Sequence, residues 1–266
     1  MENGQKHALI TGATSGIGYE LAKLFAEDGY NLVIVARNAY ELERTAAELQ
    51  DGNKIHVHVI AKDLFNAESA REVYDEVKGS GIEVSVLVND AGQGHYGEFI
   101  NTDLERELDI IKLNVMAPVT LTKYFLKDMV ERGEGKILNV GSIAGEMPGP
   151  LHSVYHGTKA FVNSWSEAIR NEVKDKGITV TVLLPGATDT DFANKANMEN
   201  AKIFAESSLS NPAEVAKDGY DALMSGDDKI ISGLKNKAMV GMGHVMPDSM
   251  VAEAMHKQQK PVDEGK

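Results

Sequence analysis

The sequence contains no cysteine and no long apolar run. Without cysteine, disulfides and thiolate-bound zinc or iron–sulfur sites are excluded. The apolar runs, such as Leu32–Ala36 and Val180–Leu184, are far shorter than the about 20 residues that span a bilayer. The first residues show no basic stretch followed by a long apolar one, so we expect no secretion signal. These absences predict a cytoplasmic protein with no membrane partner.

Basic side chains are also few. The 27 lysines and arginines stand against 40 aspartates and glutamates, which gives a formal net charge of −13. Such a molecule repels phosphate, which argues against non-specific binding to nucleic acid or to an anionic membrane surface. His56 and His58 would point to the same side of a strand, but no third ligand is evident, so we predict no metal site.

Short β-branched runs alternate with longer segments whose apolar residues recur at helical spacing. This alternation is typical of βαβ units with a mostly parallel sheet. The runs are apolar along nearly their whole length, as expected when helices cover both faces. We therefore predict an α/β fold, a single doubly wound Rossmann-type parallel sheet of about seven strands flanked by helices. The predicted strands are Ala8–Thr11, Asn31–Ala36, Ile55–Ile60, Val84–Asn89, Lys136–Val140, Ile178–Leu184 and Lys229–Ile231.

No repeat or linker interrupts the alternation, so we assign residues 1–235 to one domain. Helix starts are signalled at Thr102–Glu105, which has capping-box spacing, and at Asn211–Glu214, where a proline follows the cap. Residues 236–266 differ and are predicted to form an extension with one short helix, Asp248–Gln258. We expect the polar tail that follows to be partly disordered.

A glycine-rich turn follows the first strand directly and opens a helix. Glycine allows a sharp turn there and lets the backbone approach a diphosphate, while the helix N-terminus offers unpaired N–H groups to it. The βαβ context supports a dinucleotide site, although a tight turn that binds nothing is the alternative. The predicted contacts are Gly12, Thr14, Ser15, Gly16, Ile17 and Gly18.

Arg37 and Asn38 stand at the end of the second strand, where NAD-selective sites usually carry an acidic residue. An arginine there can pair with a 2′-phosphate, so the sequence predicts NADP(H) rather than NAD(H). A plain surface arginine is the alternative. After the third strand, Asp63 is a candidate acceptor for the adenine amino group or a helix cap, and Leu64 is a candidate cofactor contact.

Tyr155 and Lys159 are four residues apart in a helical segment, Tyr155–Lys174, and so share one helix face. A nearby cation lowers the pKa of a phenol, and the pair can then exchange a proton with a carbonyl or alcohol oxygen. Ser142, at the end of the fifth strand, supplies a hydroxyl for the same oxygen. On its own, a tyrosine and a lysine at this spacing are usually solvated residues of a helix. Here the pair follows a glycine-rich turn and a serine at the end of a strand, where ligands of doubly wound sheets bind, and this favours a catalytic pair.

Together these motifs resemble the short-chain dehydrogenase/reductase family over about residues 5–235. The matching strings are Thr11–Gly18, Asn89–Gly92, Asn114, Ser142, Tyr155–Lys159 and Pro185–Thr190. The resemblance implies that Tyr155 is the general acid, that Lys159 lowers its pKa and binds the nicotinamide ribose, and that Ser142 anchors the substrate oxygen. It further implies a helix kink and a relay water at Asn114. The implied cofactor contacts are Asn89, Ala91, Gly92, Pro185, Gly186, Thr188 and Thr190.

One position departs from the family. Asp90 stands where a second asparagine is common, which puts the strand-bracing role of that side chain in doubt. The segment 191–210 resembles the family's variable substrate lid, and its apolar residues favour a moderately hydrophobic ketone or aldehyde. The resemblance also implies a homodimer or homotetramer formed through the helices Asn114–Glu131 and Tyr155–Lys174.

The sequence therefore predicts an NADP(H)-dependent oxidoreductase that transfers hydride between nicotinamide and a small-molecule carbonyl or alcohol. Two other classes stay open. One is a non-catalytic NADP(H)-binding regulator or scaffold protein, and the other is an epimerase or dehydratase of the same fold.

Overall fold

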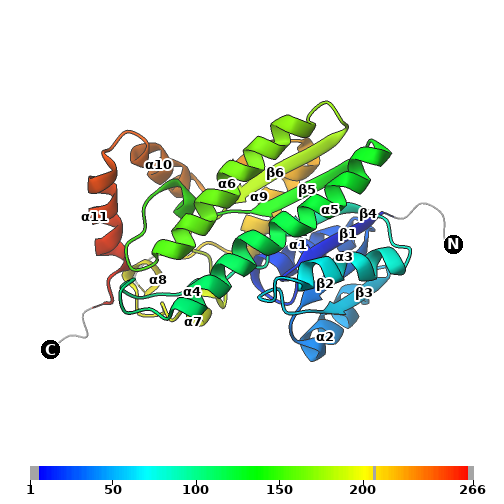
Figure 1. Ribbon diagram of the computed structural model, residues 1–266, viewed down its shortest axis with the longest axis horizontal. Helices are drawn as coiled ribbons and strands as arrows, with labels where there is room; N and C mark the ends of the chain where they lie inside the picture. Colours follow the sequence, from blue (N-terminus) through cyan, green and yellow to red (C-terminus); the bar gives the residue numbers. More distant parts are fainter. Residues whose placement is uncertain (1–5, 206–207, 263–266) are drawn as a thin grey trace.

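The computed structural model describes residues 6–205 and 208–262. Its centre is a parallel sheet of seven strands in the order β3-β2-β1-β4-β5-β6-β7, which confirms the predicted doubly wound fold (Figure 1). The strand order reverses between β1 and β4, the place where ligands bind in sheets of this type. The strands are β1 His7–Thr11, β2 Asn31–Ala36, β3 Val57–Ala61, β4 Val84–Asn89, β5 Gly135–Val140, β6 Ile178–Leu184 and β7 Lys229–Ile231.

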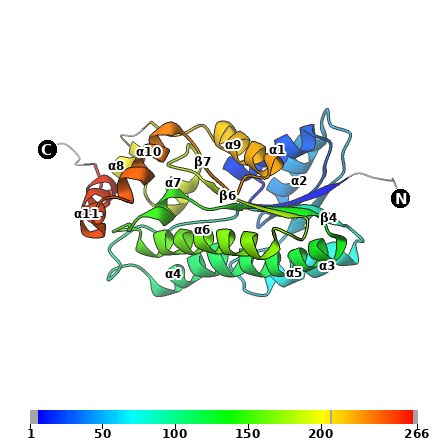
Figure 2. The same cartoon turned by 90° about the horizontal axis from the view of Figure 1, so that it is seen from above.

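Helices cover both faces of the sheet (Figure 2). One layer holds α1 (Gly16–Glu27), α2 (Ala39–Gln50) and α9 (Pro212–Ser225), and the other holds α3 (Ser69–Gly79), α5 (Ala117–Arg132) and α6 (Ser153–Val173). Successive side chains of a strand point to opposite faces. Thus Leu32 and Ile34 pack in the first layer's core, and Val33 and Val35 in the second's. Burial on both sides explains the unbroken apolar strands.

The helix that precedes α5 is joined to it without a break. A helix runs from Leu104–Ile111 (α4) through a π-helical turn, Lys112–Met116, into α5. The extra residue in a π-turn bends a helix, and Asn114 lies inside it. The predicted cap at Thr102 was wrong by one residue, because the Asp103 carboxylate accepts the N–H of Arg106 (2.8 Å), while the Thr102 hydroxyl donates to the Phe99 carbonyl. The predicted cap at Asn211 is confirmed.

The end of the chain holds two helices, α10 (Leu234–Gly243) and α11 (Asp248–Gln259). Only the second was predicted, because α10 has no clear polar and apolar faces and carries two glycines near its end. Both helices pack on a separate apolar cluster around Ile143, Met147 and Leu184. In the tail after Gln258, for which we expected partial disorder, residues 260–262 pair instead with residues 200–202, because backbone hydrogen bonds and a bridge hold them there. Residues 263–266 lie outside the described residues.

Two short helices, α7 (Phe192–Ala196) and α8 (Lys202–Ala205), belong to the segment predicted as a lid. Together with α10 and α11 they gather at the end of the molecule away from the N-terminus (Figure 1). Within the described ranges, no helix is both long and apolar enough to cross a bilayer.

Candidate active site

A cavity of about 1400 Å³ opens at the carboxyl ends of the strands. Pockets for one drug-sized ligand usually measure about 300–1,000 Å³, so this cavity has room for a dinucleotide and a second molecule. Most of the predicted site residues line it, although Gly18, Asn89 and Asn114 do not. Those that line it are Gly12, Thr14, Ser15, Gly16, Ile17, Arg37, Asn38, Asp63, Leu64, Ala91, Gly92, Ser142, Tyr155, Lys159, Pro185, Gly186, Thr188 and Thr190.

The glycine-rich turn has the backbone that the sequence predicts. Gly12 and Gly16 have φ values of +75° and +60°, a region that favours glycine. A Cβ on Gly16 would lie 3.0 Å from the Thr190 side chain, across the cavity entrance. Helix α1 begins at Gly16, and the Ser15 side chain makes no capping hydrogen bond among the described residues. Gly16 and Ile17 at the start of α1 line the cavity, where their backbone N–H groups can meet a phosphate, so the turn fits a dinucleotide.

Gly18 has another role. A Cβ there would collide with the Asp90 carboxylate and lie 2.6 Å from the Gly12 carbonyl oxygen. The residue therefore lets α1 pack closely against the turn and the end of β4, rather than touching a ligand. Its substitution would move the turn itself.

Cationic side chains surround the end of the cavity near β2 and β3. The Arg37 guanidinium lies 5.2 Å from the centre of the Phe65 ring, and the Arg106 guanidinium lies 5.1 Å from it. These distances suit cation–π contacts, which orient Arg37 beside the cavity. Arg44, Lys62 and Phe65 also line this end, and we did not predict them. They stand within a few residues of predicted positions, but no motif separates them from ordinary surface residues.

Asn38 and Asp63 both hold backbone in place. The Asn38 side chain accepts the N–H groups of Tyr40 and Glu41, and so caps α2. The Asp63 side chain accepts the N–H of Phe65 at 3.1 Å. This bond closes a turn and is not the helix cap given as an alternative, because α3 begins at Ser69 with Glu68 at its N-cap. Asp63 lines the cavity, and its adenine contact stays a prediction.

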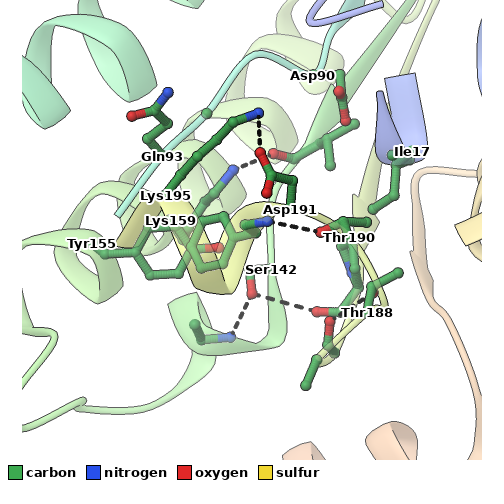
Figure 3. A pocket seen from close by; sticks show the side chains of 18 of the residues that line it. Ile17, Asp90, Gln93, Ser142, Tyr155, Lys159, Thr188, Thr190, Asp191 and Lys195 are labelled. Carbon is green, nitrogen blue, oxygen red and sulfur yellow. Dashed lines mark hydrogen bonds and ion pairs between the residues drawn. The ribbon is translucent and has the colours of Figure 1, made fainter. Parts of the chain in front are cut away.

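Ser142, Tyr155 and Lys159 meet in the same cavity (Figure 3). Ser142 follows β5, and its hydroxyl oxygen accepts the N–H of Ala144 at 3.0 Å. Tyr155 and Lys159 are one turn apart on α6, and the Lys159 ammonium lies 5.8 Å from the centre of the Tyr155 ring. Lys159 also donates to the Val140 carbonyl at 2.7 Å, which holds its stem between α6 and the end of β5.

Burial controls the protonation of the pair. It raises the pKa of Tyr155 to about 12, an effect that the negative charge of Asp90 increases and the Ser142 hydroxyl reduces. It lowers the pKa of Lys159 to about 8, although Asp90 pulls in the opposite direction. The predicted lowering of the Tyr155 pKa by Lys159 is therefore not what this structure shows, because desolvation dominates. A phenol of this kind is protonated at neutral pH and ready to donate.

Two predicted site residues point into the protein instead. Asn114 accepts the N–H of Gln93 (3.0 Å) and donates to the Gln93 carbonyl and to the Thr158 hydroxyl. It therefore ties the loop after β4 to α6, and the kink implied at this position is present as a π-turn. Asn89 donates to Thr122 and Asn139 in the core, so its side chain braces neighbouring elements and forms no cavity wall.

Asp90 lies beneath the glycine-rich turn. Its N–H donates to the Thr11 hydroxyl at 3.1 Å, and its carboxylate approaches Gly12 and Gly18. Burial raises the pKa of this carboxyl to about 7, while Lys159 and the N–H of Gly18 lower it. The bracing that we expected to be weakened here is provided by Asn89 next to it. Asp90 instead adds a titratable group to the cavity floor.

The other end of the cavity is apolar and aromatic. The His152 ring stacks on Tyr155 at 4.4 Å, and Phe192 of α7 lies 5.1 Å from the same tyrosine. Burial lowers the pKa of His152 well below its usual value, so its imidazole is neutral. Met255 and Gln259 of α11 also line this end, a contribution of the C-terminal extension that sequence reasoning missed. In the described part of the chain, no cluster of potential ligands could hold a metal.

His156, which follows Tyr155 directly on α6, also lines the cavity and connects α6 to the end of α11. Its Nδ1 lies 2.9 Å from the Met147 carbonyl, which can only accept, so Nδ1 carries the proton. Its Nε2 then accepts from the Gln259 side-chain amide, also at 2.9 Å. Tyr96 donates to the Gln259 carbonyl at 2.6 Å. The end of α11 is thus hydrogen-bonded both to α6 and to the loop after β4.

The sheet, the glycine-rich turn and the Ser–Tyr–Lys group together define a Rossmann-type dinucleotide-binding protein. A family model described as short chain dehydrogenase matches residues 6–201. The chain therefore belongs to the short-chain dehydrogenase family, as the sequence motifs indicated.

Similar proteins and solved structures agree with this family. A very-long-chain 3-oxoacyl-CoA reductase of Laccaria bicolor is 38% identical over 65% of this chain and 52% of its own length. One of Aspergillus terreus is 31% identical over 95% of this chain and 76% of its own. The chain spans about half the length of the Laccaria relative it matches. A solved short-chain dehydrogenase from Sphingobium yanoikuyae in complex with NADPH is 28% identical, with a TM-score of 0.81 over 94% of this chain and 99% of that one.

Proposed function

We propose that the protein is an NADPH-dependent reductase that converts a carbonyl group to an alcohol, in a reversible reaction. The observation that carries this proposal is the presence of Ser142, Tyr155 and Lys159 in the cavity that also contains the glycine-rich turn. A binding protein needs the turn alone, whereas the trio adds a proton donor, a cation and a second hydroxyl. The NADPH bound by the Sphingobium relative supports the choice of cofactor.

The residues that would hold the dinucleotide follow from the geometry. The turn from Gly12 to Gly16 and the start of α1 would take the diphosphate, and Arg37 would pair with the 2′-phosphate. Lys159 lines the cavity beyond the turn, and so does the loop that carries Thr188 and Thr190. When bound, NADPH supplies the hydride.

The protein itself orients the substrate and moves the proton. The Ser142 hydroxyl would hydrogen-bond the substrate oxygen and hold it toward Tyr155. As the carbon is reduced, negative charge grows on that oxygen and the Tyr155 phenol donates its proton to it. The Lys159 cation, present below about pH 8, stabilises the phenolate that remains. The phenolate is restored by uptake of a proton from solvent.

The substrate that we propose is a 3-oxoacyl thioester. The names of the relatives point to that class, and the wall of Phe192, Met198 and Met255 suits an acyl chain. We further propose a cytoplasmic homo-oligomer. The lack of cysteine suits a reducing compartment, and exposed apolar residues on the α4 to α6 layer suit subunit contact. They are Leu104, Leu108, Ile111, Met116 and Phe161.

The test is oxidation of NADPH or NADH with a panel of 3-oxoacyl thioesters, ketones and aldehydes. We expect turnover of a 3-oxoacyl thioester with NADPH preferred, and its loss in Tyr155→Phe and Ser142→Ala. Tight binding of NADPH without turnover of any carbonyl would contradict the proposal and favour a regulatory protein.

A further inference from the structure

Lysines gather at the substrate end of the cavity, although the protein as a whole carries a net charge of −13. Lys195, Lys202 and Lys257 all line the cavity. They belong to three elements, α7, α8 and α11, so no single amphipathic helix accounts for them. An anionic protein that collects cations at one opening raises the local concentration of anionic ligands there.

Backbone contacts bring two of these elements together. The N–H of Lys202 donates to the Lys260 carbonyl at 3.0 Å, and the N–H of Val262 donates to the Asn200 carbonyl at 2.8 Å. An antiparallel bridge joins Ala201 to Pro261 between them. The end of α11 therefore runs beside α8, as Figure 1 also shows. Lys257 and Lys202 consequently stand on neighbouring segments of one rim.

The third lysine lies on the same side of the cavity, close to the trio. The Lys195 ammonium lies 3.1 Å from the Asp191 carboxylate, and both residues line the cavity (Figure 3). The ion pairs Lys195–Asp191 and Lys257–Glu253 are largely exposed to solvent. Exposed pairs are weak, so a ligand anion of higher charge can replace the carboxylate.

These lysines are separate from the cations that suit the cofactor. Arg37, Arg44 and Lys62 lie by α2 and β3, at the opposite end of the cavity, and the glycine-rich turn lies between the two groups. A dinucleotide placed on the turn with its 2′-phosphate at Arg37 has no phosphate left for the lid. The second group of cations is therefore available to a second anionic ligand, which would replace the carboxylates of the exposed ion pairs.

The side chains between the three lysines and the trio indicate what the rest of that ligand is. Phe192, Met198 and Phe204 pack in the lid, and Met255 faces the cavity from α11. An apolar wall with cations at its rim fits a molecule that has an apolar chain near the reacting carbon and phosphate at its far end.

We propose that Lys195, Lys202 and Lys257 bind the phosphate groups of the carrier to which the acyl substrate is joined as a thioester. This inference rests on the proposed function and deepens it, because it assigns a recognition site for a phosphate-bearing pantetheine. That chemistry occurs in coenzyme A and in 4′-phosphopantetheine.

The experiment compares one 3-oxoacyl chain on three carriers: coenzyme A, 4′-phosphopantetheine and N-acetylcysteamine, which has no phosphate. The variant is K195Q/K202Q/K257Q, and the matched control is K176Q, an exposed lysine beyond the far end of α6. We expect the triple variant to lower the ratio of kcat/KM for the coenzyme A thioester over the N-acetylcysteamine thioester about tenfold, mainly through KM. K176Q should leave the ratio unchanged. Added salt should lower the ratio in the parent enzyme and much less in the triple variant.

The outcomes separate the two proposals. A fall that includes 4′-phosphopantetheine assigns the site to its single phosphate, and a fall for coenzyme A alone assigns it to the nucleotide phosphates. An unchanged ratio, or a raised KM for NADPH in the triple variant, would overturn the phosphate site. If no thioester is reduced by the parent enzyme, the proposed function fails, whatever the lysines do.

Discussion

The two ends of the cavity are built differently. At the cofactor end, glycines allow backbone to touch backbone, and a Cβ on Gly18 would lie 2.6 Å from the Gly12 carbonyl oxygen. At the substrate end, the residues around the start of α8 are joined to the residues that follow α11 by two backbone hydrogen bonds. The first arrangement accepts one shape of ligand. The second can change its residues without disturbing the sheet, which is how one fold serves many substrates.

The largest effect should come from the point where the two ends meet. Tyr155→Phe removes the proton donor and leaves the ring stacked on His152. Because general acid catalysis contributes about 10²- to 10⁴-fold, we expect kcat to fall about 10³-fold. Affinity for NADPH, measured by fluorescence titration, should change less than about twofold. A variant that keeps a tenth of its activity would show that another group donates the proton.

The cofactor end should tolerate even one methyl group poorly. Gly18→Ala forces the Asp90 carboxylate or the Gly12 backbone to move, so we expect NADPH affinity to fall about 100-fold, with a lower Tm. Gly241→Ala is the matched control at the other end. Nothing lies within 4 Å of its position in α10, so the change should raise stability by up to about 1 kcal/mol. Equal changes of NADPH affinity and Tm in the two variants would show that the two ends of the cavity tolerate a methyl group equally well.

The same contrast governs what the sequence could predict. The strands and the glycine-rich turn are local patterns, and six of the seven predicted strands match within one residue, while β3 starts two residues late. The hydrogen bonds of the Asn89 and Asn114 side chains could not be predicted, because they depend on core partners and on a π-turn. Helix α10, and the contribution of Met255 and Gln259 to the cavity, depend on contacts between distant segments. No local pattern encodes those contacts.

Cofactor choice should change by a smaller factor. Arg37→Asp places a carboxylate where a 2′-phosphate is expected, so we expect the ratio of NADPH to NADH affinity to fall about 10- to 100-fold, the worth of a charge-assisted hydrogen bond. Thermal shift with each cofactor measures the ratio. Arg71→Asp, on the exposed side of α3, is the control and should leave it unchanged. Unchanged preference in Arg37→Asp would move the 2′-phosphate site to Arg44 or Lys62.

The smallest effect concerns the departure at Asp90. Its pKa in the folded protein is raised to about 7 by burial, against an ordinary value of 3.8. The folded state therefore holds a proton that the unfolded state has lost, and the stability this provides is complete below about pH 4 and lost as pH rises through about 7. Asp90→Asn has no such proton. Its Tm should approach that of the parent at pH 5 and exceed it by about 2 °C at pH 8, measured without cofactor.

Other groups could change stability over the same range, so the comparison uses the difference between the two proteins at each pH. Lys159 titrates near pH 8, and loss of the Asp90 charge removes an anion that favours its protonated form. In Asp90→Asn the buried Lys159 cation has lost this anion and is less favourable. The loss opposes the predicted rise in the Tm of Asp90→Asn over the parent. A Tm difference that grows between pH 5 and 7, before Lys159 titrates, belongs to Asp90 alone. A difference that stays constant across that interval would mean that the carboxyl is already ionised at pH 5, with the Gly18 N–H and Lys159 outweighing its burial.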